Sequence, residues 1–140
     1  RSLFRVADLM HGGDTVPLVA EDAPLRRAVE EMTRPRARSA AAGRSLHACG
    51  MTTVVDADGR LTGVLTDGDL RRLHLRGAPF ETLRAGDVAS RSPRTIGADD
   101  LAAKALEVME GTITTLVVVD ESRRPCGVVH MHDILRAKIV

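Results

Sequence analysis

The sequence predicts an α+β fold built from two similar halves, each a small β-sheet packed on two helices. The first observation is the stretch GVLTDGDLRR at 63–72, which returns as GVVHMHDILR at 127–136. The second is an apolar, strand-like run before each copy, and the third is a set of apolar residues at helical spacing ahead of each run. Strand and helix patterns therefore follow one another in the same order twice along the chain.

In the first half, helical spacing predicts a buried helix face made of Leu25, Ala28, Val29 and Met32. Asp22 is the expected N-cap of this helix, and Pro24 suits its first turn. Pro17 has no N–H for a ladder, so it belongs at a sheet edge or a strand start. The other expected elements are a helical lead-in at 6–10, an extended segment at 16–19, strands at 52–55 and 61–65 around a turn at 56–59, and a helix at 66–76 whose Leu70 and Leu73 face inward.

The second half repeats this order. Asp99 is the expected N-cap of a helix that carries Ala102, Ala105, Leu106 and Met109. The other expected elements are a lead-in at 87–88, an extended segment at 94–96, strands at 115–119 and 126–129 around a turn at 120–125, and a closing helix from 131.

The spacing of matching positions differs between the helices and the strand pairs. Asp69 and Asp133 are 64 residues apart, whereas Met32 and Met109, on the preceding helices, are 77 apart. The first half therefore carries a surplus of 13 residues, which lies within 34–48 and is rich in Arg, Ala and Ser. We expect a solvent-exposed loop or an extended helix end there, and the most mobile part of the chain. A basic arm for nucleic acid is the alternative.

Composition excludes several classes of protein. The only aromatic residues are Phe4 and Phe80, and the net charge is +1, so neither base stacking nor a bulk field favours nucleic acid or a membrane surface. Cys49 and Cys126 lack metal-type spacing, which predicts free thiols in a reducing, cytoplasmic compartment. No apolar run is long enough to span a membrane, and no signal peptide is apparent. Because the chain starts at Arg1, we expect a piece of a longer protein.

Two four-residue steps, each between a strand and a helix, carry the polar groups. The first step is Thr66–Asp69 and the second is His130–Asp133. Such a step can direct backbone N–H groups, a hydroxyl and a carboxylate at a sugar–phosphate. The alternative for Thr66 and Asp69 is a capping pair that needs no ligand. His130 is expected to be a poor cap, so the second step is the first place to look for a ligand.

The two histidines of the second step also raise a metal hypothesis. His130 and His132, with Asp133, could hold Zn²⁺, but a further ligand such as His11 or a second chain would be needed. The alternative is that these histidines hydrogen-bond a ligand phosphate or cap the closing helix. Asp67 has no nucleophile or base partner, so no catalytic residue is expected.

The repeated segments resemble the tandem cystathionine-β-synthase (CBS) domain pair, whose halves are related by a pseudo-two-fold axis. DLMHGGDTVPLV, GMTTVVD, GVLTDGDLRR and GVVHMHDILRAKIV together resemble the C-terminal CBS pair of bacterial arabinose-5-phosphate isomerases. The resemblance implies a first CBS motif at 1–77, with the surplus as an exposed insertion, and a second at 78–140. It covers the whole chain except the surplus.

The resemblance also implies site residues. In CBS pairs the Thr or Ser and the Asp of this step contact ligand phosphate and ribose, which points to Thr66, Asp69 and Asp133. The chain departs from the family pattern at His130, which stands where Thr is usual. Candidates for the wall beside the base are Pro17, Met51, Thr52, Thr95 and Thr114. Candidates for an anionic tail are Arg72 and Arg136.

The implied function is a non-catalytic regulatory module without a cofactor. The resemblance implies AMP, ATP or the cytidine nucleotide-sugar CMP-Kdo as allosteric ligand. It also implies a sugar-isomerase (SIS) domain as partner, an aldose–ketose isomerisation in the parent chain, a role in making the lipopolysaccharide sugar Kdo, and a homo-oligomer formed through the CBS helices. The competing hypothesis is a structural dimerisation module with no ligand, which would use exposed apolar faces at Leu70–Leu73 and Ile134–Leu135.

Overall fold

Each half of the fold is assembled from stretches that are distant in the sequence. The computed structural model describes residues 3–34, 38–39, 44–45, 50–111 and 113–137. A central unit holds the described residues from Pro17 to Pro93 apart from 38–39 and 44–45, and a terminal unit holds those two short stretches with the residues before and after the central unit. No helix in these described stretches is long and apolar enough to cross a membrane.

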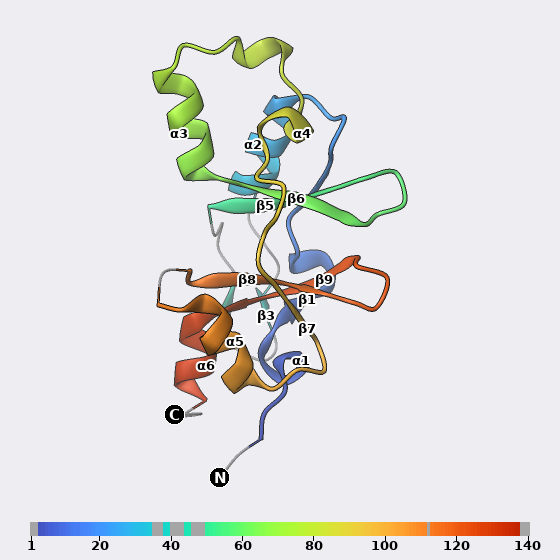
Figure 1. The fold of residues 1–140 in the computed structure, drawn as a ribbon, viewed down its shortest axis with the longest axis vertical. Helices are drawn as coiled ribbons and strands as arrows, with labels where there is room; N and C mark the ends of the chain where they lie inside the picture. Colours follow the sequence, from blue (N-terminus) through green and yellow to red (C-terminus); the bar gives the residue numbers. More distant parts are fainter. Residues whose placement is uncertain (1–2, 35–37, 40–43, 46–49, 112, 138–140) are drawn as a thin grey trace. The chain divides into compact units, whose positions relative to one another are not determined.

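The central unit is a three-stranded sheet covered by helices on one face (Figure 1). Its strand order is β2-β5-β6, with β2 parallel to β5 and β5 antiparallel to β6. The core packs the apolar face of the first long helix against the strands, with Leu25, Val54 and Leu65 fully buried. The elements are β2 (Leu18–Ala20), α2 (Leu25–Thr33), β5 (Met51–Val55), β6 (Leu61–Thr66), α3 (Asp67–Leu75), the 3-10 turn η2 (Phe80–Thr82) and α4 (Ala85–Val88).

The terminal unit repeats this plan with a fourth strand. Its order is β1-β9-β8-β7, with β7 parallel to β8 and the other pairs antiparallel. Met109, Leu116 and Ile134 are fully buried in its core. The elements are α1 (Val6–Leu9), β1 (His11–Gly12), the 3-10 turn η1 (Gly13–Thr15), β7 (Thr95–Gly97), α5 (Ala102–Met109), β8 (Thr115–Val119), β9 (Pro125–His130) and α6 (Met131–Arg136).

The two hairpins confirm the sequence repeat in their registers. Met51 pairs with Thr66 at the open end of β5–β6, and Thr115 pairs with His130 at the matching end of β8–β9. The register of each hairpin shifts at the last residue of its first strand, between Val54 and Val55 in β5 and between Val118 and Val119 in β8. The offset of 64 read from the sequence is therefore the offset between two equivalent hairpins.

The lead-in of each half packs on the sheet that the other half supplies. The first lead-in, residues 5–12, places α1 and β1 in the terminal unit, where His11 pairs with Val128 of β9. The second lead-in, residues 84–90, places α4 in the central unit, where Ser90 bridges Val64 of β6. Figure 1 shows the blue first lead-in beside the red β9 and the yellow α4 beside the green β6. The predicted CBS motifs and the compact units thus divide the chain at different points, and the motif boundaries stay a prediction.

A close backbone approach explains the glycine that opens each repeated stretch. A Cβ on Gly63 would lie 2.6 Å from the carbonyl oxygen of Ser90, and a Cβ on Gly127 would lie 3.1 Å from that of His11. Both contacts are shorter than a methyl group tolerates without movement. Only glycine lets the lead-in strands cross the sheets so closely.

The predicted N-caps Asp22 and Asp99 are wrong. Helix α2 begins at Leu25 and α5 at Ala102, and in neither does an aspartate side chain cap the first turn. The reason is the lead-ins: the carbonyl of Asp22 accepts the guanidinium of Arg84, and that of Asp99 accepts Arg5 at 2.6 Å. These stretches of chain dock a lead-in, so each helix starts only after them.

The insertion and the proposed dimer faces also need correction. Strands β3 (Arg38–Ser39) and β4 (Arg44–Ser45) form an antiparallel pair, where a loop or an extended helix end was expected. The rest of 35–49, and with it the predicted mobility, lies outside the described residues. Leu73 is 2% and Ile134 is 0% exposed, so neither belongs to an exposed apolar face. Both pack inward because they lie on the core side of α3 and α6, and Leu135 is the residue left at the surface.

Candidate functional site

The first step is a complete helix cap. The Thr66 hydroxyl accepts from the Asp69 N–H at 3.2 Å, and the Asp69 carboxylate accepts from the Thr66 N–H at 2.9 Å. The Asp67 N–H donates to the Gly50 carbonyl at 2.9 Å, which ties the start of α3 to the residue before β5. The predicted capping pair is therefore confirmed, and it fills most of the donors that a phosphate would use.

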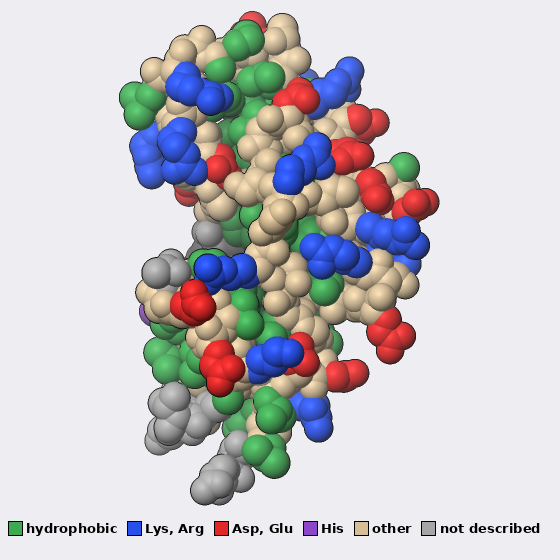
Figure 2. All heavy atoms as spheres, viewed as in Figure 1, with side chains coloured by type: hydrophobic (Ala, Val, Ile, Leu, Met, Phe, Trp, Pro, Cys, Tyr) green, Lys and Arg blue, Asp and Glu red, His purple; other side chains and the backbone are tan. Residues whose placement is uncertain are grey.

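The carboxylate of the first step is also paired with an arginine. Arg72 donates to Oδ1 of Asp69 at 2.8 Å, while Oδ2 takes the Thr66 N–H and hydroxyl. Figure 2 shows basic side chains over α3, where Arg71, Arg72 and Arg76 are exposed. A groove of about 600 Å³ runs beside them. Its described lining residues are Asp69, Arg72, Leu73, Leu75, Arg76, Ala78, Pro79, Leu83, Asp87 and Val88.

The second step is capped in a different way. Nδ1 of His130 accepts from the His132 N–H at 3.0 Å, and the Asp133 carboxylate accepts from the His130 N–H at 3.1 Å. The Met131 N–H donates to the Thr114 carbonyl at 2.7 Å, as Asp67 does to Gly50 in the first step. The expectation that His130 is a poor cap is wrong, because a ring nitrogen without a proton accepts as the Thr hydroxyl does.

Asp133 is a buried carboxylate held by a buried histidine. Nε2 of His11, on β1, lies 3.1 Å from Oδ2 of Asp133. Burial alone would raise the pKa of Asp133, but the hydrogen bonds from His11 and the His130 N–H, with the nearby imidazoles, lower it on balance. A carboxylate can only accept, so Nε2 carries the proton in this pair. Nδ1 of His11 is buried and has no hydrogen-bond partner among the described residues.

The two carboxylates differ in what their second oxygen does. Oδ1 of Asp69 is consumed by Arg72 at 2.8 Å, whereas Oδ1 of Asp133 lies 3.9 Å from Arg136. A distance of 3.9 Å is an ion pair but too long for a hydrogen bond. The second step therefore keeps an acceptor oxygen that a ligand hydroxyl can use, next to an exposed arginine and the exposed His132.

The candidates for the base-side wall fall into two groups. Met51 and Thr52 are buried on β5 of the central unit, and the Thr52 hydroxyl donates to the Thr53 carbonyl at 3.1 Å. Pro17, just before the edge strand β2, accepts from the Thr53 hydroxyl at 2.6 Å. Thr95 and Thr114 lie in the terminal unit. Two wall candidates meet the steps directly: Met51 pairs with Thr66, and the Thr114 carbonyl accepts from the Met131 N–H.

The metal hypothesis gains no ligand set. The rings of His130 and His132 meet edge to face with centroids 4.7 Å apart. In the described part of the chain, no group of three or more His, Cys, Asp or Glu side chains is placed to hold a metal ion. Cys126 is a half-buried free thiol, and burial and the charge of Asp120 raise its pKa, so it is protonated at neutral pH. Cys49 lies outside the described residues.

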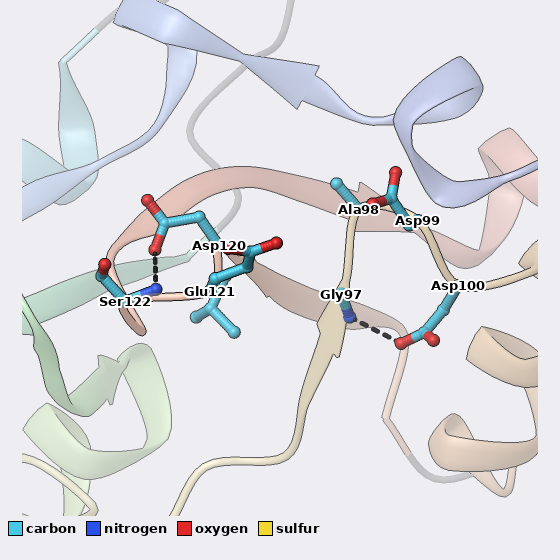
Figure 3. A pocket seen from close by; sticks show the side chains of 8 residues that line it. Gly97, Ala98, Asp99, Asp100, Asp120, Glu121 and Ser122 are labelled. Atoms are coloured by element: carbon cyan, nitrogen blue, oxygen red, sulfur yellow. Dashed lines mark hydrogen bonds between the residues drawn. The ribbon is translucent and has the colours of Figure 1, made fainter.

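A hollow of about 530 Å³ lies at the Val119 end of β8, whereas His130 pairs with Thr115 at the opposite end (Figure 3). The acidic Asp99, Asp100, Asp120 and Glu121 line it, so it would repel a phosphate. Two of these carboxylates already serve the local turns: Asp100 accepts from the Gly97 N–H at 2.8 Å and Asp120 from Ser122 at 2.9 Å. This hollow is therefore not the predicted site.

The pairing of His11 with Asp133 is the contact that sequence reasoning missed. It considered His11 only as a further metal ligand. The signal that could have found it is the repeat itself, because the lead-in motif of the second half has Ser90 where the first has His11. A histidine in one copy and a serine in the other is a difference in side-chain chemistry at equivalent positions, and such a difference can be read from the sequence.

Comparison with known proteins gives matches over the whole chain. The model of the CBS domain family matches residues 6–76 and 85–139. Arabinose 5-phosphate isomerase KdsD of Pseudomonas aeruginosa is 40% identical over 141 residues, which cover 100% of this chain and 40% of that protein. KdsD of Escherichia coli K12 is 37% identical over 138 residues, 99% of this chain and 38% of that protein. The chain thus spans about two fifths of the length of these relatives.

Solved structures share the fold. Hypoxic Response Protein I, in a crystal structure with two coordinated zinc ions, superposes with a TM-score of 0.74 and 27% identity over 95% of this chain and 98% of that one. CBSX2 in complex with AMP gives a TM-score of 0.74 at 20% identity over 97% of this chain and 96% of that one. These similarities confirm the predicted fold class.

Proposed function

Because the chain belongs to the CBS domain family, we propose that it is a regulatory module that binds a nucleotide or nucleotide-sugar and has no catalytic role of its own. The identity of 40% to KdsD supports a further proposal about the parent chain. That chain would join this module to an SIS domain that interconverts ribulose 5-phosphate and arabinose 5-phosphate, on the route to Kdo. CMP-Kdo, as the activated end product, is then a suitable feedback ligand beside AMP and ATP.

The observation that carries the proposal is the state of Asp133. It is ionised, fixed by two donors, and keeps Oδ1 outside hydrogen-bond distance of Arg136. A ribose hydroxyl donating to that oxygen would replace water with a charge-assisted hydrogen bond. Arg136 and His132 supply donors for a phosphate on the same side of α6. At the first step the equivalent oxygen is already occupied by Arg72, so we place the ligand at the second step.

Regulation would follow from thermodynamic linkage. A ligand that binds only the folded module stabilises it by about 2.7 kcal/mol at a free concentration near a hundred times Kd. That is enough to shift a coupled two-state equilibrium in an attached enzyme domain, where coupling free energies are about 1–3 kcal/mol.

Calorimetric titration of the 140-residue chain tests the proposal. The probes are AMP, ATP, CMP, CMP-Kdo, arabinose 5-phosphate and Zn²⁺. We expect one nucleotide to bind and Asp133→Asn to weaken it at least about tenfold, because a hydrogen bond to a charged group is lost. The matched variant Asp69→Asn should change the affinity little.

Each other outcome has a definite meaning. Failure of every nucleotide to bind at millimolar concentration refutes the sensor and leaves a structural module. A larger loss from Asp69→Asn than from Asp133→Asn moves the ligand to the first step. Thermal unfolding of both variants without ligand controls for damage to the helix caps. Binding of Zn²⁺ alone would revive the metal hypothesis for His130 and His132.

A further inference from the structure

One buried side-chain pair connects the first lead-in to the second step. His11 lies on β1, at the end of the lead-in, and Asp133 lies in the first turn of α6. Both side chains are buried, and Nε2 and Oδ2 are 3.1 Å apart. Because Nδ1 has no partner within the described residues, Asp133 is the imidazole's polar anchor. A change in the position or charge of this carboxylate therefore acts directly on His11.

The rest of the first lead-in is held by the buried side chain of Val6 and by backbone hydrogen bonds to the approach to α5. The Val6 N–H donates to the Asp100 carbonyl and the Ala7 N–H to the Ala98 carbonyl, both at 2.9 Å. The Met10 N–H closes the turn of α1 on the Val6 carbonyl at 2.9 Å. The Val6 and Ala7 amides report whether the lead-in is docked, since each exchanges with solvent when its bond opens, and the Met10 amide reports whether α1 keeps its turn.

The second lead-in offers an internal comparison with the same geometry. The Ala85 N–H donates to the Ala23 carbonyl at 2.9 Å and the Gly86 N–H to the Glu21 carbonyl at 2.8 Å, as Val6 and Ala7 do in the first. Ser90 occupies the position of His11, but it is exposed and, among the described residues, makes no side-chain hydrogen bond to Asp69. One lead-in is thus linked to its step through a side chain and the other is not.

We propose that His11 couples occupancy of the second step to docking of the first lead-in. The inference rests on the proposed function, since it needs a ligand at Asp133. A ligand hydroxyl on Oδ1 holds the carboxylate in the orientation that presents Oδ2 to His11, so binding tightens the lead-in. By reciprocity, loss of the His11 bond weakens ligand binding by the same factor that the ligand stabilises docking.

Amide hydrogen exchange with and without ligand tests the coupling in the unaltered chain. The probe is AMP, or CMP if AMP does not bind. We expect saturating nucleotide to slow exchange at Val6, Ala7 and Met10 by at least about fivefold. The equivalent amides of Ala85, Gly86 and Ala89 should be unchanged. Equal slowing at both sets, or no slowing at the first, overturns the inference, and this comparison needs no variant that might fail to fold.

Variants then show whether His11 carries the effect. His11→Leu removes the donor, and we expect it to abolish the slowing at the first lead-in and to raise Kd at least about fivefold. His11→Gln keeps an N–H at nearly the place of Nε2 and should restore both. Ser90→Ala, at the equivalent position of the second lead-in, should change neither. The role of His11 is refuted if His11→Leu binds the nucleotide, and slows amide exchange at the first lead-in, to the same extent as the unaltered chain.

The outcomes separate this inference from the proposed function. Binding of nucleotide without any change at the first lead-in overturns the coupling and leaves the sensor intact. No binding by any nucleotide overturns both. Restored binding but unrestored protection in His11→Gln also counts against the coupling, because reciprocity requires the two to be restored together.

Discussion

Asp133 caps α6 and anchors His11 with one side chain, and we propose that it also accepts a ligand hydroxyl. It is ionised in spite of burial because its donors outweigh the cost of removing it from water. Asp69, its equivalent, caps α3 in the same way but spends its other oxygen on Arg72. At the scale of single residues, the two copies share the helix cap and differ in whether the second carboxylate oxygen already has a hydrogen bond.

The lowered pKa of Asp133 predicts a loss of stability in acid. Its folded pKa lies below its unfolded pKa, so the ionised group stabilises the fold above the unfolded value and loses that effect as pH falls through the folded value. We expect the difference in unfolding free energy between the unaltered chain and Asp133→Asn to shrink below about pH 4. Urea unfolding at neutral pH and in acid measures it. A difference that does not vary with pH would contradict the assignment.

At the scale of elements, each lead-in approaches its sheet closely where the repeated stretch begins. Gly63 and Gly127 permit this approach, and the hairpins β5–β6 and β8–β9 keep the same register beneath it. The glycine of the repeat is therefore a packing requirement of the lead-ins. It is separate from the polar step that follows three residues later.

Replacing Gly63 by Ala should destabilise the central unit. The new Cβ would lie 2.6 Å from the Ser90 carbonyl oxygen, so the backbone must move, at a cost of about 1–3 kcal/mol. Gly68→Ala is the matched control, because there the nearest neighbour is the exposed guanidinium of Arg72 at 3.3 Å, which can move away. We expect it to be neutral or, by up to about 1 kcal/mol, stabilising. Urea unfolding of both variants decides, and equal effects would count against the packing argument.

At the scale of the whole molecule, each lead-in packs on the sheet of the other half. The sequence repeat and the compact unit therefore contain different residues. A chain cut after residue 77 keeps β5 and β6 but lacks α4 and Ser90, which close the central unit. A chain spanning 17–93 keeps all of them.

Two fragments of equal length therefore make a test. We expect 17–93 to fold and unfold cooperatively in urea, followed by circular dichroism, and 1–77 to remain largely unfolded. The physical reason is that Leu25 and Ala85 belong to one core. The fragment 1–77 lacks Ala85 and so leaves part of that apolar core exposed to water. A fragment 1–77 as stable as 17–93 would show that the motif is the folding unit.

The sequence by itself determined the elements and their repetition. Hydrophobic spacing identified both hairpins and both long helices, and Met32 and Met109 are core residues as expected, because local pattern decides which face is buried. The Thr66 cap was equally readable, since its partner lies three residues away. Tertiary structure decided the rest.

Contacts between distant segments leave no local pattern. The lead-ins joined the opposite sheets, displaced the expected caps Asp22 and Asp99, and brought His11 to Asp133 across 122 residues of chain. Packing also buried Ile134, which the dimerisation hypothesis placed at the surface, whereas Leu73 is buried as its helical spacing predicted. Each of these aspartates also has an arginine three residues further along its own helix, but only the structure shows that Arg72 reaches Asp69 at 2.8 Å while Arg136 stays 3.9 Å from Asp133.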